Sequence, residues 1–543
     1  MNKQRLKRAS KIGLSIAIVL TIAWLIAHAI VPPPQPPSTP PASALAQFGP
    51  YHPDMTLRQA FESLPPAGGE NVGLTLLPEN ERAWVARWRM LEAAHETIDV
   101  SYFILREDIF GAAFLGHLLK KAKDGVNIRL LLDRQGTVMS FTSQLGLDWL
   151  DTLANTHRAQ VKVFRPLTER YLEAFATANP IAVVASEHDK IMVCDRATGM
   201  IGGRNISVEY FAHPDDYERA FEDVDVILRG TAVARGLTAA FETQFESDGA
   251  RPIAPEQLDI ASHEEHLLLA YRAMDAWLNG RTLDATLAQR IRALGLSWQD
   301  DLQKLPRLRG HATAPLTIDA HAETRLLDSN TRLTPGADKI GQSLLRLVQS
   351  ARHEILIQSP YLVLSKEAID VLAQAAERDV AITIYTNSPV SSDNALSQAF
   401  FQEQWPELLA RVKTLRLFVT GQTHTLHAKL MVFDDQVAMV GTYNLDPISM
   451  GINSEIMAAI WSTPFAKRVA EKPRSRLHRG APLVYEYRIQ RDAAGRAMRD
   501  ANGRPIVAFG PEQHAPPDQW RKVQAFWAVL RTAEKIPGFS PVF

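Results

Sequence analysis

Cysteine is almost absent from this chain of 543 residues: Cys194 is the only one, so no disulfide can form within it. A large domain folds without disulfides in oxidising and in reducing compartments alike, so this absence does not identify the compartment. Cys194 ends an apolar run, where we expect a packed small side chain and not a reactive thiol.

An excess of charge of either sign is also lacking. Lys and Arg number 59 against 60 Asp and Glu, which gives a formal net charge of −1. A dedicated nucleic-acid-binding protein usually carries a basic excess, so no nucleic-acid partner is expected. Hydrophobic residues make up 46% and charged residues 22% of the chain, as in a folded protein, and the length predicts two domains beside accessory segments.

Groups of His, Asp and Glu with the spacing of a metal site are absent as well, so no metal site is predicted. His213 and His424 are interpreted as surface or loop residues.

The N-terminus carries the one long apolar run. Five basic residues precede residues 12–31, which contain no Asp, Glu, Lys or Arg. Twenty residues at about 1.5 Å each span about 30 Å, the thickness of the hydrocarbon core of a bilayer. We therefore predict a single membrane anchor with its basic flank in the cytoplasm, which would place the body in the periplasm of a bacterium, at the inner membrane.

A cleaved secretory signal is the alternative reading of this segment. Ala44 and Ala46 have the small-x-small form of a cleavage site, but the run is longer than the ~7–15 residues of a signal core and ends well before that site. Seven of the ten residues 32–41 are proline, which favours an extended spacer and predicts a linker over residues 32–54.

Two stretches of the body resemble each other. Each has a short β-rich strand, a helical stretch and an apolar strand, over residues 98–133 and 355–387. Such strand–helix–strand units predict two pseudo-symmetric α/β/α lobes, with mixed, mostly parallel sheets covered by helices. We place the lobes at residues 55–250 and 321–475, a helical insertion at 251–320, and a C-terminal extension at 476–543 with a hairpin turn near 490–495.

Each lobe ends in one pattern at one spacing. Lys follows His by two residues, Asp by seven, a small pair by fourteen and fifteen, and Asn by seventeen. The first copy is His188, Lys190, Asp195, Gly202, Gly203 and Asn205, and the second is His427, Lys429, Asp434, Gly441, Thr442 and Asn444. One His-x-Lys is usually a chance surface feature, but two copies that share five offsets are not. On a strand, positions i and i+2 share a face, so each His and its Lys project into one site.

The residue types fit metal-free chemistry on a phosphodiester. A neutral imidazole can attack phosphorus while a second, protonated imidazole donates to the leaving oxygen, and both states are accessible near neutral pH. Lys190 and Lys429 would stabilise charge on the phosphoryl oxygens, with Asn205 and Asn444 as hydrogen-bond donors. We favour His188 as the nucleophile.

The remaining motif residues have supporting roles in this hypothesis. One carboxylate per half should fix a His tautomer, and the candidates are Asp223 and Glu455. Asp195 and Asp434 should mainly close the turn after each strand. The glycines after the next strand should let backbone approach a bound phosphate.

These residues resemble the signature of the phospholipase D superfamily. Residues 201–211, 359–361, 386–388 with Asp393, and 441–447 resemble bacterial cardiolipin synthases, in particular the branch that uses phosphatidylethanolamine as co-substrate. The resemblance covers about residues 65–535. Glu187 and Leu364 depart from it, since an apolar residue and a proline are expected there.

The resemblance implies a bilobed fold with one active site between the lobes and no metal or other cofactor. It implies transfer of a phosphatidyl group, through a phosphohistidine, onto phosphatidylglycerol. Hydrolysis of phospholipid to phosphatidate is the nearest alternative, because the sequence does not decide whether water or a lipid alcohol is the acceptor. A superfamily nuclease ranks lower for a chain with an anchor and no basic excess, and a non-catalytic scaffold is disfavoured because both motifs are complete.

Overall fold

The structure is a computed structural model that describes residues 54–66, 68–138, 145–179, 181–253, 260–311, 315–333 and 338–533. The anchor predicted at residues 12–31, and all of the predicted linker except Asp54, lie outside these residues. In the part of the chain that is described, no helix combines the length and the apolar character needed to cross a bilayer.

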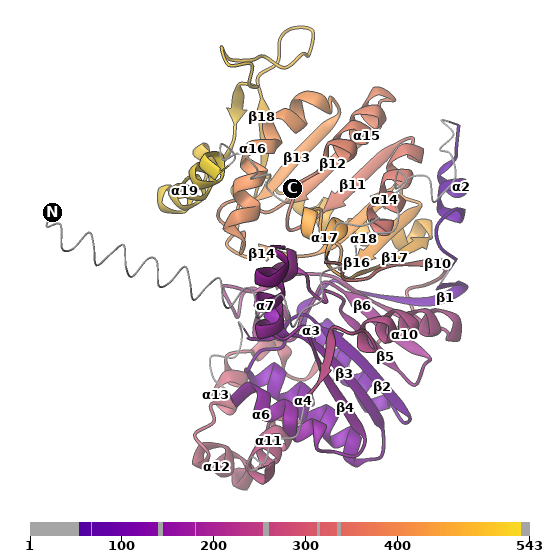
Figure 1. Cartoon of the computed structure of the whole chain (residues 1–543), viewed down its shortest axis with the longest axis vertical. Coiled ribbons are helices and arrows are strands. Elements are labelled where there is room, and N and C mark those ends of the chain that lie inside the picture. The colour runs from indigo at the N-terminus through magenta and orange to yellow at the C-terminus, as the bar shows by residue number, and fades with distance from the viewer. Residues whose placement is uncertain are drawn as a thin grey trace, which may run out of the picture.

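Among the described residues, 17 strands form one large sheet. This sheet runs through both halves of the chain (Figure 1). Following the pairing, the first half contributes β9 (Ala250–Pro252), β4 (Ala159–Phe164), β3 (Asn127–Asp133), β2 (Thr97–Tyr102), β5 (Ile191–Cys194), β6 (Thr198–Gly202), β8 (Asp225–Arg229) and β1 (Gly68–Leu77). The second half continues with β10 (Ala320–Ser329), β17 (Glu455–Trp461), β16 (Val437–Gly441), β15 (Lys429–Phe433), β11 (Glu354–Gln358), β12 (Ala381–Thr386), β13 (Leu415–Thr420), β18 (Val484–Ile489) and β19 (Val507–Phe509).

This strand order is symmetric about the antiparallel pair β1–β10. Moving outward from that pair, β8 corresponds to β17, β6 to β16, β5 to β15 and β2 to β11. The outer strands β3, β4 and β9 correspond in the same way to β12, β13 and β18. The two halves predicted from the sequence are thus two copies of one α/β unit.

The prediction of mostly parallel sheets is wrong. Only β2, β3 and β4 in the first half, and β11, β12 and β13 in the second, pair in parallel within the large sheet. The strands that follow each His-x-Lys motif form hairpins instead, because the turns 195–197 and 434–436 are too short for a crossover helix. The sequence-based expectation came from the strand–helix–strand units alone, which make up just the outer part of each half.

Helices cover the outer faces of both halves. The first half has α3 (Asn80–Ala93), α4 (Ile109–Lys123), α5 (Arg134–Val138), α6 (Leu145–Ala154), α7 (Leu167–Thr177), α8 (Ile181–Val184), α9 (Val208–Phe211) and α10 (Thr231–Phe245). The second half has α14 (Lys339–Ser350), α15 (Lys366–Glu377), α16 (Ala395–Arg411), α17 (Pro447–Gly451) and α18 (Thr463–Leu477). Asp108 and Ser365 cap the N-termini of α4 and α15.

The segment predicted as a helical insertion is mainly helical. It contains α11 (Ile260–Leu278), α12 (Ala285–Ala293), α13 (Trp298–Gln303) and the 3₁₀ turn η2 (Pro306–Leu308). These helices pack on the first half and belong to its core. Gly116 of α4 permits the contact, because a Cβ there would lie 2.0 Å from the carbonyl oxygen of Leu267 in α11.

Alternating residues of the central strands are buried in different hydrophobic cores. In β5, Met192 packs under the helices of the first half, while Ile191 faces a core shared by both halves. In β15, Met431 packs under the helices of the second half, while Leu430 faces the shared core. This period of two is the strand periodicity read from the sequence, and here both faces are apolar because both are covered.

The shared core joins the two halves into one structural unit. The helix α2 (Leu57–Glu62) precedes the first half in sequence, but Phe61 of α2 and Leu64 after it pack into the core of the second half.

The C-terminal extension adds to the edge of the second half. β18 pairs with β13, and the chain then forms two turns at Gly495 and Gly503 before β19, η4 (Pro511–Gln513) and α19 (Pro517–Ala533). The first of these turns lies where the hairpin turn was predicted.

Candidate active site

Each His-x-Lys motif is held by the opposite half of the chain. Glu187, which precedes His188, forms a bridge with Ser454, which precedes Glu455. Leu426, which precedes His427, pairs with Glu222 in the short parallel sheet of β14 (Thr425–Leu426) and β7 (Phe221–Glu222). The two pairings have the same register, so each His lies beside the carboxylate of the other half.

His188 contacts Glu455 directly. Its Nδ1 lies 2.9 Å from Glu455 Oε1, and its backbone N–H donates to Ser454 Oγ at 3.0 Å. Ser449 and Thr442 donate their hydroxyls to the two oxygens of the same carboxylate. A carboxylate on Nδ1 leaves Nε2 of the imidazole as the atom available for chemistry.

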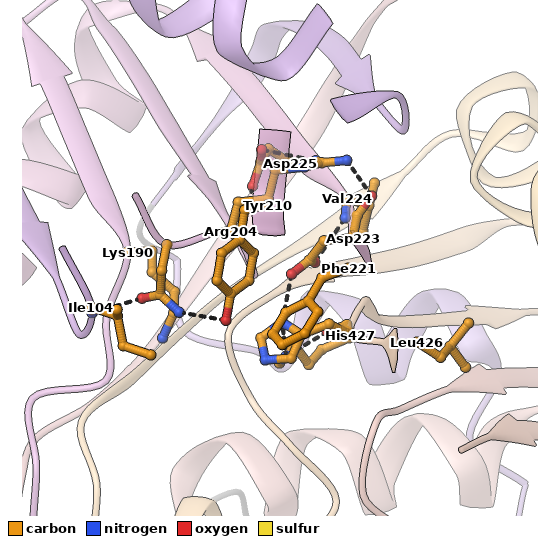
Figure 2. A network of polar contacts seen from close by, with 12 residues as sticks. Ile104, Lys190, Arg204, Tyr210, Phe221, Asp223, Val224, Asp225, Leu426 and His427 are labelled. Carbon is orange, nitrogen blue, oxygen red and sulfur yellow. Dashed lines mark hydrogen bonds and ion pairs between the residues drawn. The ribbon is translucent and has the colours of Figure 1, made fainter. Parts of the chain in front are cut away.

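His427 repeats this arrangement with Asp223. Its Nδ1 lies 2.6 Å from Asp223 Oδ2, and Figure 2 shows the carboxylate directed at the imidazole, with the ring of Phe221 beside it. The backbone N–H of Val224 donates to the other oxygen of Asp223 at 2.8 Å. Asp223 and Glu455, predicted as orienting carboxylates, therefore both contact a motif His, and each contacts that of the other half.

The two carboxylates differ in their electrostatics. Burial alone would raise the pKa of Asp223, but the adjacent His427 and Lys429 lower that pKa below its usual range. Burial raises the pKa of Glu455 to about 7, and Lys190 and the two hydroxyl donors offset this only in part. His427 thus has an ionised partner, whereas His188 has one that titrates near neutrality.

The imidazoles and ammonium groups are also perturbed by burial. Burial and the charges of Lys190 and Lys429 lower the pKa of His188 well below its ordinary value. Burial and Lys429 lower the pKa of His427, and Asp223 opposes them. Burial lowers the pKa of Lys190, and it lowers the pKa of Lys429 to about 8. An anion bound between these groups would oppose these shifts, because it favours the protonated, positively charged forms of the imidazoles and ammonium groups.

The lysines and asparagines are buried next to the imidazoles. Lys190 Nζ donates to the carbonyl of His188 at 2.7 Å, and Lys429 Nζ donates to the carbonyl of His427 and lies 3.1 Å from its Nε2. Asn205 accepts from the backbone N–H of Ile104 at 3.0 Å and donates to the hydroxyl of Tyr210 at 2.9 Å. The Oδ1 of Asn444 is buried and has no partner among the described residues.

The motif glycines have a steric reason, in addition to the approach to phosphate expected from the sequence. A Cβ on Gly203 would lie 2.2 Å from Asp223 Oδ1, and one on Gly202 would lie 2.0 Å from Asp225 Oδ1. In the second half a Cβ on Gly441 would lie 2.1 Å from the carbonyl of Ile456 in β17. These positions make room for the segments that carry the orienting carboxylates.

Asp195 and Asp434 lie at the far end of the motif strands from the imidazoles. Both have positive φ, 51° and 50°. The carboxylate of Asp195 accepts the backbone N–H groups of residues 95–97, and that of Asp434 accepts those of residues 352–354. Each side chain thereby fixes the start of the neighbouring strand, β2 or β11, which is a structural role.

Several residues near the imidazoles were not among the predicted site residues. The ring of Phe103 lies 5.1 Å from that of His188, and the ring of Tyr210 lies 5.3 Å from that of His427. Asp393 accepts a hydrogen bond of 3.0 Å from Tyr361 and interacts electrostatically with His427. The available signal was their position just after strands that end at the same edge of the sheet.

A buried ion-pair network supports the segment between β7 and β8 that carries Asp223. Arg204 donates to Asp225 at 2.9 Å and to the carbonyl of Asp223 at 2.6 Å (Figure 2). Arg87 donates to the same Asp225 at 2.9 Å. All three charged side chains are almost fully buried. The pair Asp225–Arg204 therefore fixes the backbone position from which Asp223 reaches His427.

Comparison with known proteins places this geometry in a family. The family profile described as "Cardiolipin synthase, PLD-like domain" matches residues 88–247 and again residues 344–475, which are the two halves of the sheet. Among proteins of known sequence, cardiolipin synthase C of Escherichia coli K12 is 28% identical over 429 residues, covering 74% of this chain and 84% of that protein. The major cardiolipin synthase ClsA of Bacillus subtilis 168 is 24% identical over 407 residues, covering 74% and 68%.

The fold has a counterpart among solved structures. The phosphatidylserine synthase of Haemophilus influenzae Rd KW20 superposes with a TM-score of 0.57 at 13% identity, covering 89% of this chain and 98% of that one. At this identity the likeness concerns the fold alone.

Proposed function

The chain belongs to the phospholipase D-like family of cardiolipin synthases, and on that premise we propose that it transfers a phosphatidyl group from a phospholipid onto phosphatidylglycerol through a phosphohistidine. The observation that carries the proposal is the crossed pairing of His188 with Glu455 and of His427 with Asp223. It supplies two imidazoles, each oriented through Nδ1, beside two buried ammonium groups.

In the first displacement, Nε2 of neutral His188 attacks the phosphorus of the donor lipid. A phosphorus–nitrogen bond forms, and the bond from phosphorus to the headgroup oxygen breaks. Protonated His427 gives its proton to that oxygen, so the headgroup leaves as a neutral alcohol. Lys190 and Lys429 hold the phosphoryl oxygens.

In the second displacement, neutral His427 takes the proton of a hydroxyl of phosphatidylglycerol. The oxygen attacks phosphorus, the phosphorus–oxygen bond forms and the bond to His188 breaks, which returns both imidazoles to their starting states. The product is a cardiolipin-type lipid. Phosphatidylglycerol would release glycerol as donor, and phosphatidylethanolamine would release ethanolamine.

His188 is assigned as the nucleophile, and His427 as the acid and base, from the electrostatics of the two imidazoles. An imidazole that alternates between charged and neutral forms is best supported by an ionised carboxylate, and Asp223 beside His427 has its pKa lowered. A nucleophile must be neutral, and the pKa of His188 is lowered well below its ordinary value by burial and by two lysines.

Water is the competing acceptor, and its use would make the enzyme a phospholipase D that forms phosphatidate. Purified full-length protein is incubated with phosphatidylglycerol alone and with added phosphatidylethanolamine, and lipids and released alcohols are identified by mass spectrometry. Cardiolipin with equimolar glycerol or ethanolamine supports the proposal, and phosphatidate as the sole product contradicts it. Because the negative charge of the phosphodiester, and the charge that develops on its oxygens during displacement, are met by two lysines, a chelator should leave the rate unchanged.

We further propose that residues 12–31 anchor the chain in a bacterial inner membrane with the body in the periplasm. The proposal rests on the uncharged apolar run and the five basic residues before it. A reporter that is active only in the periplasm, fused after Phe543, should give signal. Signal from a cytoplasm-specific reporter alone would contradict this orientation.

A further inference from the structure

The helix α7 has one exposed face that is apolar. Tyr171, Leu172 and Phe175 have exposed fractions of 59%, 49% and 37%, and they lie within five positions of one another. With exposed Thr168 they occupy positions i, i+3, i+4 and i+7, which is a single side of a helix. This face is called the α7 face below.

The charged residues of α7 lie outside the α7 face and form ion pairs. Arg170 is fully buried and donates to Asp133 at 2.7 Å, and Glu173 pairs with Arg165 at 2.6 Å. Glu169, the remaining charged residue of the helix, pairs with Arg251. The α7 face itself therefore contains no charged residue, although Glu169, whose side chain is 44% exposed, and Glu173 line a pocket together with Leu172.

The α7 face is rigidly connected to the active site. Besides Asp133, Arg170 donates to the hydroxyl of Ser186 at 3.0 Å, two residues before His188. Asp133 in turn accepts from the backbone N–H of Glu187 at 2.9 Å. The helix begins just after β4 ends, and the parallel strands β2, β3 and β4 end at the edge of the sheet where His188 lies.

The second half exposes an apolar side chain at the equivalent edge. Leu396, at the second position of α16, is 41% exposed. It follows Asp393, which contacts Tyr361 beside the site. Apolar surface is thus exposed at the strand ends of both halves, and Figure 1 shows α7 at the level where the two halves meet.

We propose that the α7 face, with Leu396, inserts into the surface of the bilayer that contains the substrate lipids, and so brings the active site to the headgroups. The inference rests on the proposed function. An uncharged apolar face with a tyrosine at its border is the chemistry that suits the boundary between headgroups and acyl chains.

The length of chain that precedes the described residues favours the bilayer as the partner of the α7 face. The predicted anchor ends at residue 31 and the described body begins at residue 54, so 22 residues connect them. An extended chain of that length spans at most about 70–80 Å. A tether of that reach keeps the body at a high effective concentration near the bilayer, so a face of a few apolar residues suffices for docking.

The first test locates the face by fluorescence. Full-length Phe175→Cys, labelled with an environment-sensitive dye, is reconstituted in vesicles of phosphatidylglycerol and phosphatidylethanolamine with nitroxide-bearing acyl chains. The matched control is Ile318→Cys, which is also apolar and 44% exposed but lies beside β1, and the labelled parent measures any reaction of buried Cys194. Quenching at position 175 but not at 318 supports the proposal, and equal or absent quenching overturns it.

The second test separates this inference from the proposed function. The variant Tyr171→Ser, Leu172→Ser, Phe175→Ser should lose about tenfold or more of the rate on vesicle phosphatidylglycerol, and stay within about twofold on monomeric dihexanoyl phosphatidylglycerol. An unchanged rate on vesicles overturns the α7 proposal, as does self-association of the parent that the variant loses. A parent inactive on both substrates contradicts the proposed function instead.

Discussion

The imidazole of His188 and the carboxylate of Glu455 lie 2.9 Å apart, although 267 positions separate them in the chain. The same exchange joins His427 to Asp223, over 204 positions. Neither half therefore contains a complete site, because each supplies an imidazole and a lysine to its own motif and a carboxylate to the other. The crossed pairing couples the integrity of the site to the core that both halves share.

The partner of His188 predicts a pH dependence. Burial raises the pKa of Glu455 to about 7, so below that pH it carries a proton that can be donated to Nδ1, and Nε2 then holds the ring proton and cannot attack. The rate should therefore rise with pH between about 5.5 and 8. Glu455→Gln should lower kcat by about 10²-fold and remove this rise. The measurement is kcat/KM against pH for both proteins on phosphatidylglycerol in mixed micelles, because kcat/KM reports the groups of the free enzyme, and an unchanged rise in the variant would refute the assignment.

The nucleophile can be identified with a donor that needs no acid. Phosphatidyl-p-nitrophenol has a leaving group that departs without a proton, so His427→Ala should still form the phosphohistidine on His188 and then stall. We expect a burst of about one equivalent of p-nitrophenol from His427→Ala and no burst from His188→Ala. Stopped-flow absorbance measures the burst, and mass spectrometry locates the added phosphatidyl group. A burst from His188→Ala alone would assign the nucleophile to His427.

Gly203→Ala tests why glycine occupies the motif. The new Cβ would lie 2.2 Å from Asp223 Oδ1, so the carboxylate must move away from His427. We expect a loss of at least about 10²-fold in kcat, since complete loss of the carboxylate that orients a catalytic His costs about 10⁴-fold. Gly73→Ala is a matched control in strand β1, since its nearest contacts at 3.3–3.5 Å are with side chains. Activity is expressed per folded molecule from the thermal transition, and near-normal activity of Gly203→Ala would contradict the crowding argument.

The sequence pattern predicted which chemical groups form the site. It did not predict how the two halves bring these groups together. Repeated spacing identified His188, Lys190, His427 and Lys429 as groups that share a site, because strand geometry places i and i+2 on one face. Which carboxylate contacts which imidazole depends on the register of Glu187 with Ser454, a contact between residues far apart in the chain. No local propensity encodes such a register.

The fold shows the same division. The parallel strands were visible as strand–helix–strand units, but the antiparallel centre was not, since short hairpins leave only a weak local signal in fully apolar strands such as residues 191–194. Likewise α2 reads as an element of the first half, and only the tertiary packing of Phe61 assigns it to the second.

Glu187 departs from the apolar residue expected before the first motif His, and this position yields a prediction about stability. Its side chain is fully buried, and in the part of the chain that the structure describes its carboxylate makes no hydrogen bond of good geometry, although the hydroxyl of Ser101 lies beside it. Burial, together with neighbouring Asp189, raises the pKa of Glu187 well above its ordinary value. The folded protein therefore retains a proton that the unfolded chain has lost above about pH 4.5.

The sign of the effect follows from that proton. A group whose pKa is raised on folding contributes most below its unfolded pKa, and the contribution is lost as pH rises towards the folded pKa, at up to about 1.4 kcal/mol per pH unit. Glu187→Leu removes the titrating group and should raise the free energy of unfolding by about 1–3 kcal/mol at pH 8, and by less at pH 5. Activity should be retained, because His188 is positioned by Ser454 and Glu455.

Thermal melts of wild type and Glu187→Leu in detergent, from pH 5 to pH 8, measure this difference. Exposed Glu218→Gln is the control for a change of net charge, and its melting temperature should follow that of the wild type at every pH. The melting temperature of Glu187→Leu should exceed that of the wild type by a margin that widens with pH. If the variant melts below the wild type at pH 8, the carboxylate has a compensating partner. Burial of Glu187 would then not lower the free energy of unfolding.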